Sequence, residues 1–176
     1  MDSFIRSSAC LEEFLELARG ELSAFLSQVP SPVLVLGYGQ GLGMEEDTSE
    51  FTAPLGSKLG NLVVPVVKRF ASSLSDIIWI GRALTCDVIL PFENISKIHA
   101  VLSRDAYGQF LLADAGSRNG TWLNGVRLKD AERLPLLDKD RVRFGAMEGW
   151  FVLPQSFYDL LQEGKWSPEK VKAGAL

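Results

Sequence analysis

The chain has 176 residues, 47% of them hydrophobic and 23% charged, which is enough for one globular domain with a hydrophobic core plus an extension. Its apolar stretches are too short for a transmembrane helix, and the N-terminus lacks the basic-then-apolar pattern of a signal peptide. Cys10 and Cys86 lie far apart, which argues against a disulfide framework and against a zinc site. We therefore expect a cytoplasmic protein without a membrane partner, in which Cys86 is a small core residue at the start of a strand.

The net charge of −4 is unevenly distributed along the chain. Residues 1–60 carry nine acidic and three basic side chains, whereas residues 82–133 carry six acidic and seven basic ones. The acidity therefore belongs to the N-terminal segment. No basic stripe interleaved with aromatic residues is present, so the composition argues against binding to nucleic acid.

The first 32 residues predict a helical extension. Its apolar residues recur at three- and four-residue steps: Leu11, Phe14, Leu15, Ala18, Leu22, Phe25, Leu26 and Val29. Ser8 is the expected N-cap, Cys10 is expected on a helix face, Gly20 is a point where the helix can kink or split, and Pro30 ends it. The apolar stripe either packs on the flank of the domain or forms a dimerisation face.

Residues 33–36 predict a first strand, followed by a glycine-rich stretch and then an acidic cluster at residues 45–50. A strand that runs into a glycine-rich loop raises the possibility of a dinucleotide site. The third glycine of that fingerprint would fall on Leu42 or Met44, however, and no Gly-Lys-Ser/Thr follows. We therefore predict that residues 37–60 form a mobile surface loop, and the enzyme hypothesis rests on that glycine stretch alone.

Short apolar runs bounded by turn residues follow along the chain, and they predict strands. Residues 61–69 contain Pro65 in the middle, which favours an edge strand or a bulge. The other expected strands are residues 77–80, 87–90, 100–102, 110–113, 141–144 and 150–153. A short helix at 156–161 follows Pro154, and the last ten residues are expected to fray. The pattern predicts a mainly β sandwich of about ten to eleven strands over residues 33–153, with a C-terminal helix and tail over 154–176.

Four short motifs lie on the predicted loops between these strands. They are Gly81-Arg82, Ser96-Lys97-Ile98-His99, Ser117-Arg118-Asn119-Gly120-Thr121 and Asn124-Gly125. Their order and spacing resemble the forkhead-associated (FHA) domain, in which Gly-Arg, Ser-x-x-His, Asn-Gly-Thr and a second Asn-Gly follow one another. The resemblance covers roughly residues 62–153, with the motifs in a core of 77–145. It implies a β-sandwich whose loops bind phosphothreonine peptides.

The motif residues are donors suited to a phosphate. Arg82 offers a planar guanidinium fork, Ser96 a hydroxyl donor and Lys97 a second cation at the rim of the site. The resemblance further implies that Ser117 and Arg118 close over the phosphate, and that Asn119 bonds the peptide backbone. Many members of the family have a small Ser or Thr in place of Arg118, so this guanidinium either reaches the phosphate or points outward.

The resemblance gives structural roles to Gly81, His99, Gly120 and Asn124. His99 is the only histidine of the chain. The sequence shows no pattern in which a Ser or Cys nucleophile and an orienting Asp would form a catalytic triad with it. Metal binding would need partner ligands that the chain lacks. We therefore expect no catalytic residue, no metal and no cofactor, with His99 bracing the Ser96 loop.

These observations predict a non-catalytic phosphothreonine-peptide binding module. By the resemblance it acts as a bacterial signalling adaptor, a monomer or weak dimer that works with a Ser/Thr kinase or its substrate. The alternative is a phosphate-independent scaffold that self-associates through the sheet face or the N-terminal helix. Thr48 is a possible phosphosite of the chain itself, because carboxylates flank it and Phe51 stands three positions on, where FHA-type domains commonly read specificity.

Overall fold

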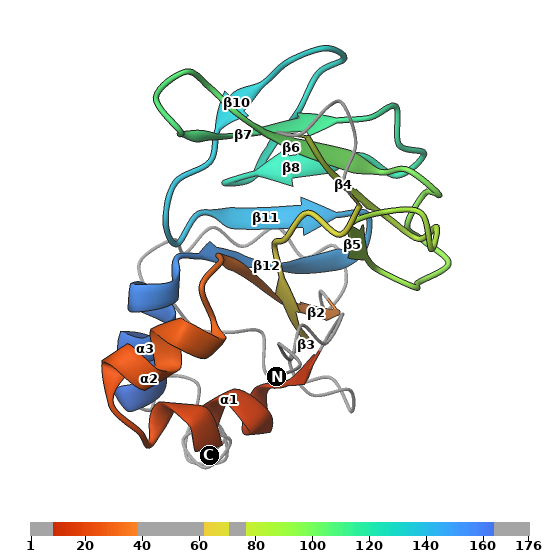
Figure 1. The fold of residues 1–176 in the computed structure, drawn as a ribbon. Helices are drawn as coiled ribbons and strands as arrows, with labels where there is room; N and C mark the ends of the chain where they lie inside the picture. Colours follow the sequence, from red (N-terminus) through yellow and green to blue (C-terminus); the bar gives the residue numbers. More distant parts are fainter. Residues whose placement is uncertain (1–8, 39–61, 71–76, 164–176) are drawn as a thin grey trace, which may run out of the picture.

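The computed structural model describes residues 9–38, 62–70 and 77–163, which form two packed β-sheets and three helices (Figure 1). The larger sheet has the strand order β1 (Ala9–Cys10), β3 (Leu62–Pro65), β2 (Val33–Tyr38), β12 (Met147–Val152), β11 (Arg141–Phe144), β8 (Thr121–Leu123) and β9 (Val126–Arg127). The smaller sheet has the order β10 (Leu134–Pro135), β7 (Phe110–Asp114), β6 (Ala100–Arg104), β4 (Ile78–Gly81) and β5 (Val88–Ile89). The predicted mainly β sandwich is confirmed.

Alternation of side chains along the strands builds the core between the two sheets. In β11, Val142 and Phe144 are buried in this core, while Arg141 is exposed on the opposite face. The residues of β2 from Val33 to Leu36 are all apolar, and both faces of the strand are buried. Leu34 and Leu36 enter the core between the sheets, and the valines between and before them enter a second core on the outer face.

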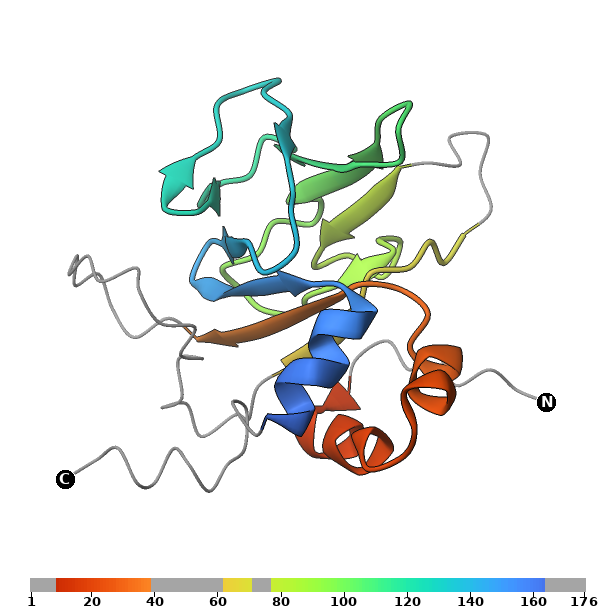
Figure 2. The ribbon, with the colours of Figure 1, turned by 90° about the vertical axis from the view of Figure 1, so that its left-hand side faces the viewer.

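The second core lies between the outer face of the larger sheet and the helices α1 (Leu11–Ala18), α2 (Leu22–Gln28) and α3 (Pro154–Gln162) (Figure 2). The ring of Phe157 lies 5.3 Å from that of Phe14 and 6.0 Å from that of Phe25. The N-terminal apolar stripe therefore packs on the flank of the sandwich, as the first of the two alternatives predicted. The helix splits at Gly20, which separates α1 from α2.

Three local predictions are wrong. Cys10 lies in β1, paired with Leu62, and not on a helix face. The short β1 also makes β3 an inner strand, where an edge strand or a bulge was expected. The pairing between β1 and β3 involves only Leu62 and Val63 of β3, so Pro65 pairs with β2 but has no partner in β1. Finally, β2 continues through Gly37 and Tyr38, because both pair with β12 where a loop was expected.

Several predictions fall outside the described residues. They concern the Ser8 cap, the loop from residue 39 onward with Thr48, and the C-terminal tail from residue 164. Within the described ranges, no helix has the length and apolar character needed to cross a membrane.

Candidate functional site

The loops that follow β4, β5 and β7 gather at one end of the sandwich, on the right in Figure 1. Arg82 donates its backbone N–H to the carbonyl of Ser96 at 2.9 Å, and Ala83 donates to that of Lys97 at 3.1 Å. The backbone N–H of Arg118 donates to Oγ of Ser96 at 3.0 Å. The three motif loops are therefore held against one another, with Ser96 in the middle.

Gly81 allows the first two loops to approach this closely. A Cβ at this position would lie 2.3 Å from the carbonyl oxygen of Lys97 and 2.9 Å from its carbonyl carbon. Any larger residue would push the Ser96 loop away from Arg82. The support role predicted for Gly81 thus has a steric reason.

Arg82 is exposed at the end of β4, and its Nε donates to the carbonyl of Ile95 at 3.2 Å. That bond orients the guanidinium, and within the described residues its two terminal nitrogens bond no other group. Lys97 and Arg118 are also exposed at this end. Three exposed cations therefore lie on the loops that meet at the half-buried Ser96.

His99 is fully buried directly below this surface. Its Nδ1 accepts the backbone N–H of Ser96 at 3.1 Å, so Nε2 carries the proton and donates to the carbonyl of Gly120 at 2.9 Å. The ring also meets Phe144 edge-on at 5.9 Å. Burial lowers the pKa of His99, although the carbonyl of Gly120 and the charge of Asp114 act in the opposite direction. His99 is therefore neutral and joins the Ser96 loop to the facing loop.

The hydroxyl of Ser117 faces into its own loop. It donates to Oδ1 of Asp114 at 2.7 Å and accepts the backbone N–H of Gly120 at 2.8 Å. These bonds hold the loop that carries Arg118, and the approach of Ser117 to a phosphate stays a prediction.

Asp114 organises this loop, and the motif search missed it. Its carboxylate also accepts the hydroxyl of Thr121 at 2.6 Å and the backbone N–H groups of Gly116 and Ser117. Burial, the largest single influence, raises the pKa of Asp114, but the bonds from Thr121 and Ser117, with His99 nearby, outweigh it and lower the pKa overall. The available signal was an Asp at the end of a strand, three residues before a predicted turn.

The amide of Asn119 donates from Nδ2 to the carbonyl of Asn94 at 2.7 Å, across the two loops. Both amide atoms of Asn94 itself are buried without a hydrogen-bond partner among the described residues. A Cβ on Gly145 would lie 2.8 Å from the carbonyl oxygen of Asn94, so the two residues are tightly packed. Asn94 is a second site residue that no motif singled out.

Asn124 stabilises a turn away from the cationic surface. Its backbone has a φ of 49°, its Nδ2 donates to Asp140 at 2.8 Å, and its Oδ1 accepts the backbone N–H of Arg141 at 2.9 Å. These contacts fit the loop-stabilising role expected for it. Asn and Gly tolerate the left-handed conformation that the turn requires.

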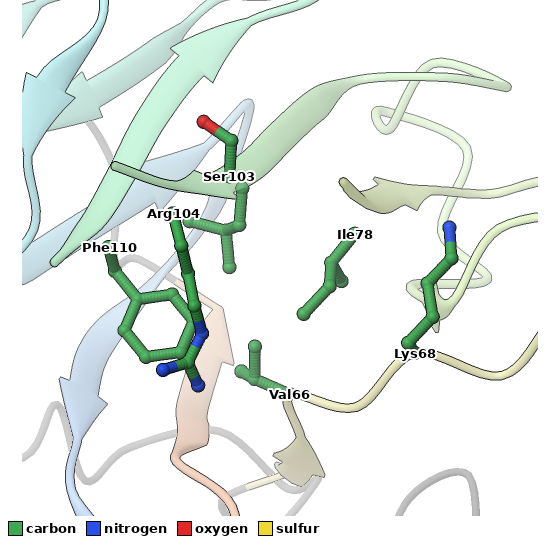
Figure 3. Close-up of a pocket in the computed structure, with 7 residues that line it drawn as sticks. Val66, Lys68, Ile78, Ser103, Arg104 and Phe110 are labelled. Atoms are coloured by element: carbon green, nitrogen blue, oxygen red, sulfur yellow. The ribbon is translucent and has the colours of Figure 1, made fainter. Parts of the chain in front are cut away.

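A groove of about 190 Å³ lies at the opposite end of the sandwich (Figure 3). It is lined by Val66, Lys68, Ile78, Leu102, Ser103, Arg104 and Phe110. Lys68 bonds Asp87 at 3.3 Å and the carbonyl of Ile77 at 2.5 Å, and the guanidinium of Arg104 lies over the ring of Phe110. None of the motif residues lines this groove.

The loop end therefore presents hydrogen-bond donors and positive charge. Its one histidine is buried and has both ring nitrogens engaged. Among the described residues, no group of His, Cys, Asp and Glu side chains is arranged to hold a metal ion. Such a surface is suited to binding an anion with several acceptor oxygens.

Comparison with known proteins gives matches in the same region. Residues 78–145 match the model of the FHA domain family. Human kanadaptin is 35% identical over 83 residues, which cover 42% of this chain and 11% of kanadaptin. Rat mediator of DNA damage checkpoint protein 1 is 49% identical over 43 residues, which cover 24% of this chain and 3% of that protein. The chain thus matches only a small part of either relative.

Solved structures include Mycobacterium tuberculosis EmbR in complex with a low-affinity phosphopeptide, with 28% identity, a TM-score of 0.41, and coverage of 45% of this chain and 20% of EmbR. Another is the N-terminal FHA domain of S. cerevisiae Rad53p in complex with a phosphothreonine peptide, with 22% identity, a TM-score of 0.45, and coverage of 55% and 88%. Because the relatives are both bacterial and eukaryotic, bacterial origin stays a prediction. The match to the FHA domain family covers residues 78–145, the part of the chain that carries the motif loops.

Proposed function

We propose that this chain binds phosphothreonine peptides at the loop end of the sandwich and acts as an adaptor, not as an enzyme. The observation that carries the proposal is the joint between the three loops, in which Arg118 donates its N–H to the hydroxyl of Ser96 and Arg82 donates its N–H to the Ser96 carbonyl. The FHA family is known for binding phosphothreonine peptides.

The charges of the ligand and of the site are complementary. A phosphothreonine carries nearly two negative charges and three acceptor oxygens at neutral pH. The guanidinium fork of Arg82 is the main donor, and each charge-assisted bond contributes about 1.5–3 kcal/mol. The hydroxyl of Ser96 accepts from Arg118 and so keeps its own hydrogen to donate to a phosphate oxygen. Lys97 adds charge at the rim.

The remaining motif residues shape the site in this proposal. The side-chain Nδ2 of Asn119 donates to the carbonyl of Asn94. We assign the side-chain oxygen of Asn119 to the backbone of the peptide. The exposed side chain of Arg118 is assigned to the phosphate, and Ser117 to the loop that carries it. The adaptor would meet a Ser/Thr kinase or its substrate in the cytoplasm.

The alternative is a phosphate-independent scaffold that self-associates through the sheet face or the N-terminal helix, and the helix route has less support. The apolar stripe of that helix is used within the chain, because Phe14 and Phe25 are buried against α3 and the sheet. A dimer built on this stripe would need the second core to open.

The test is a phosphopeptide library screen of the full chain, followed by calorimetry on one selected peptide in phosphorylated and unphosphorylated form. We expect binding of the phosphorylated peptide and a loss of at least a hundredfold in affinity without the phosphate. Equal affinity for the two forms would show that the chain is a phosphate-independent scaffold.

A further inference from the structure

One half of the outer face of the larger sheet is bare of the helices that the structure describes. The second core covers the outward side chains of β2, β3 and β12, among them Val35, Val63 and Trp150. No residue of β8, β9 or β11 belongs to this core, and the helices lie away from these strands in both views (Figure 1, Figure 2). Among the described residues, the second core therefore covers β2, β3 and β12 but not β8, β9 and β11.

A row of paired residues crosses this bare half. Arg143 of β11 pairs with Trp122 of β8, which in turn pairs with Arg127 of β9. The guanidinium of Arg143 lies 3.5 Å from the centroid of the indole ring, and that of Arg127 lies 5.5 Å from it. We call these three residues the Arg-Trp ladder. Both cations are thus held against one aromatic ring.

The ladder has an acidic neighbour, Glu148 of β12, which is the cross-strand partner of Arg143. The carboxylate of Glu148 forms its ion pair with Nε of Arg141 at 2.5 Å. Among the described residues, neither Arg127 nor Arg143 has an ion-pair partner. A guanidinium that stacks on an aromatic face keeps its N–H edges available, and these edges match the two oxygens of a carboxylate.

The ladder adjoins the phosphate-binding loops through Gly120. A Cβ on Gly120 would lie 2.8 Å from Cη2 of Trp122 and 2.8 Å from Nε of Arg127. The carbonyl of the same glycine accepts the proton of His99, and its N–H donates to Ser117. The ladder therefore starts next to the loop that carries Arg118.

We propose that the Arg-Trp ladder binds acidic side chains that flank the phosphothreonine, so that the ligand of this chain is an acidic phosphopeptide. This inference rests on the proposed function and adds to it the sequence class of the ligand. Three neighbouring strands span about 10 Å, and an extended peptide advances about 3.3 Å per residue. A run of about three acidic residues therefore matches the length of the ladder.

The experiment compares three phosphothreonine peptides of equal length: one with three glutamates before the phosphothreonine, one with three after it, and one with glutamines at all six positions. We expect the intact chain to prefer one of the acidic peptides over the neutral one about five- to tenfold. In Arg127→Gln/Arg143→Gln we expect the preference to fall below twofold, with affinity for the neutral peptide unchanged. Arg127→Gln alone, which leaves Arg143 on Trp122, should lose part of the preference.

Arg104→Gln is the matched control. Arg104 also stacks on an aromatic ring, 4.1 Å from the centroid of Phe110, but it lies at the opposite end of β6 from the site. Removing this charge should leave the preference intact, which separates the ladder from an effect of net charge. Melting curves of each variant verify that it is folded.

A preference that is absent in the intact chain, or that persists in the double variant, overturns the proposal. A rise in affinity for the acidic peptides in the double variant also overturns it, because the arginines would then oppose the binding of acidic peptides. Arg82→Ala distinguishes this failure from that of the proposed function, since it should lose all three peptides. If the neutral phosphopeptide binds and Arg82→Ala abolishes that binding, the phosphate site stands whatever the ladder does.

Discussion

The imidazole of His99 joins two loops that the chain separates by about twenty residues, because its Nε2 donates to the carbonyl of Gly120 at 2.9 Å while its Nδ1 accepts the N–H of Ser96. This neutral ring holds the Ser96 loop and the Arg118 loop together, alongside the bond from Arg118 N–H to Ser96 Oγ. The arrangement leads to the following predictions for stability and binding.

Replacing His99 with alanine should destabilise the fold. The change leaves the buried carbonyl of Gly120 and the N–H of Ser96 without their partner, which costs about 1–3 kcal/mol of unfolding free energy. Denaturant unfolding measures this loss, and phosphopeptide affinity should fall as a consequence. If the unfolding free energy is unchanged and binding is still lost, His99 contacts the ligand directly.

The stability of the protein should depend on pH in the range where histidine titrates. The pKa of His99 is lowered in the fold by burial, so the unfolded chain takes up a proton that the folded chain does not. The contribution of the neutral ring is therefore complete above about pH 6.5 and is lost as the pH falls below the unfolded value toward the folded one. Thermal melts between pH 7.5 and 5 should show the decrease.

His99→Gln is the control for this pH dependence. His99 is the only histidine of the chain, so the variant should show a flatter profile over the same range. A second loss of stability belongs to Asp114. Its pKa is lowered overall, so its contribution is present above its unfolded pKa near 4 and is lost as the pH falls through the folded value. An unchanged profile in His99→Gln would show that another group titrates.

Replacing Arg82 with alanine should abolish phosphopeptide binding while the fold stays intact. Its side chain is exposed and makes one hydrogen bond, to Ile95, so little stability depends on it. Arg82→Lys should recover only part of the affinity, because a point charge does not replace a planar fork. Calorimetry with a selected phosphopeptide measures both variants. Most of the affinity remaining in Arg82→Ala would place the phosphate elsewhere.

Replacing Gly81 with alanine should impair binding and stability together. The new Cβ would lie 2.3 Å from the carbonyl oxygen of Lys97, which belongs to backbone and can only move with its loop. We expect a loss of at least 1 kcal/mol in unfolding free energy and a weaker phosphopeptide complex. Gly108→Ala offers a comparison, since no atom lies within 4 Å of a Cβ there, although its φ of 80° adds strain. Wild-type binding by Gly81→Ala would refute the steric role.

Replacing Phe157 with alanine should destabilise the fold by about 3–5 kcal/mol, because this fully buried ring packs between α1, α2 and the sheet. Phosphopeptide affinity of the molecules that remain folded should be unchanged, since the second core lies away from the loop end. A stable variant that changes only the oligomeric state would mean that the helices serve self-association.

Local pattern was sufficient to predict many of the elements. The alternation of Arg141, Val142, Arg143 and Phe144 predicts a strand with the bounds that β11 has, because a strand with one buried face needs a period of two. The three- and four-residue spacing of the N-terminal segment predicts a helix for the same kind of reason, and Gly20 marks the point where it divides. The order of the four motifs was enough to identify the type of loop surface and its family resemblance.

Pairing between distant segments was decided only by the tertiary structure. Cys10 is in a strand because β3, some fifty residues later, offers it a partner, and this partner also makes β3 an inner strand. Asn94 contacts Asn119, which lies 25 residues later in the chain, only after the sheets have brought their two loops together. The same holds for the ladder, whose residues come from three strands. Sequence periodicity indicates which face of a helix or strand is buried. Contacts between elements depend on the register of strand pairing, which is set only when the sheets form.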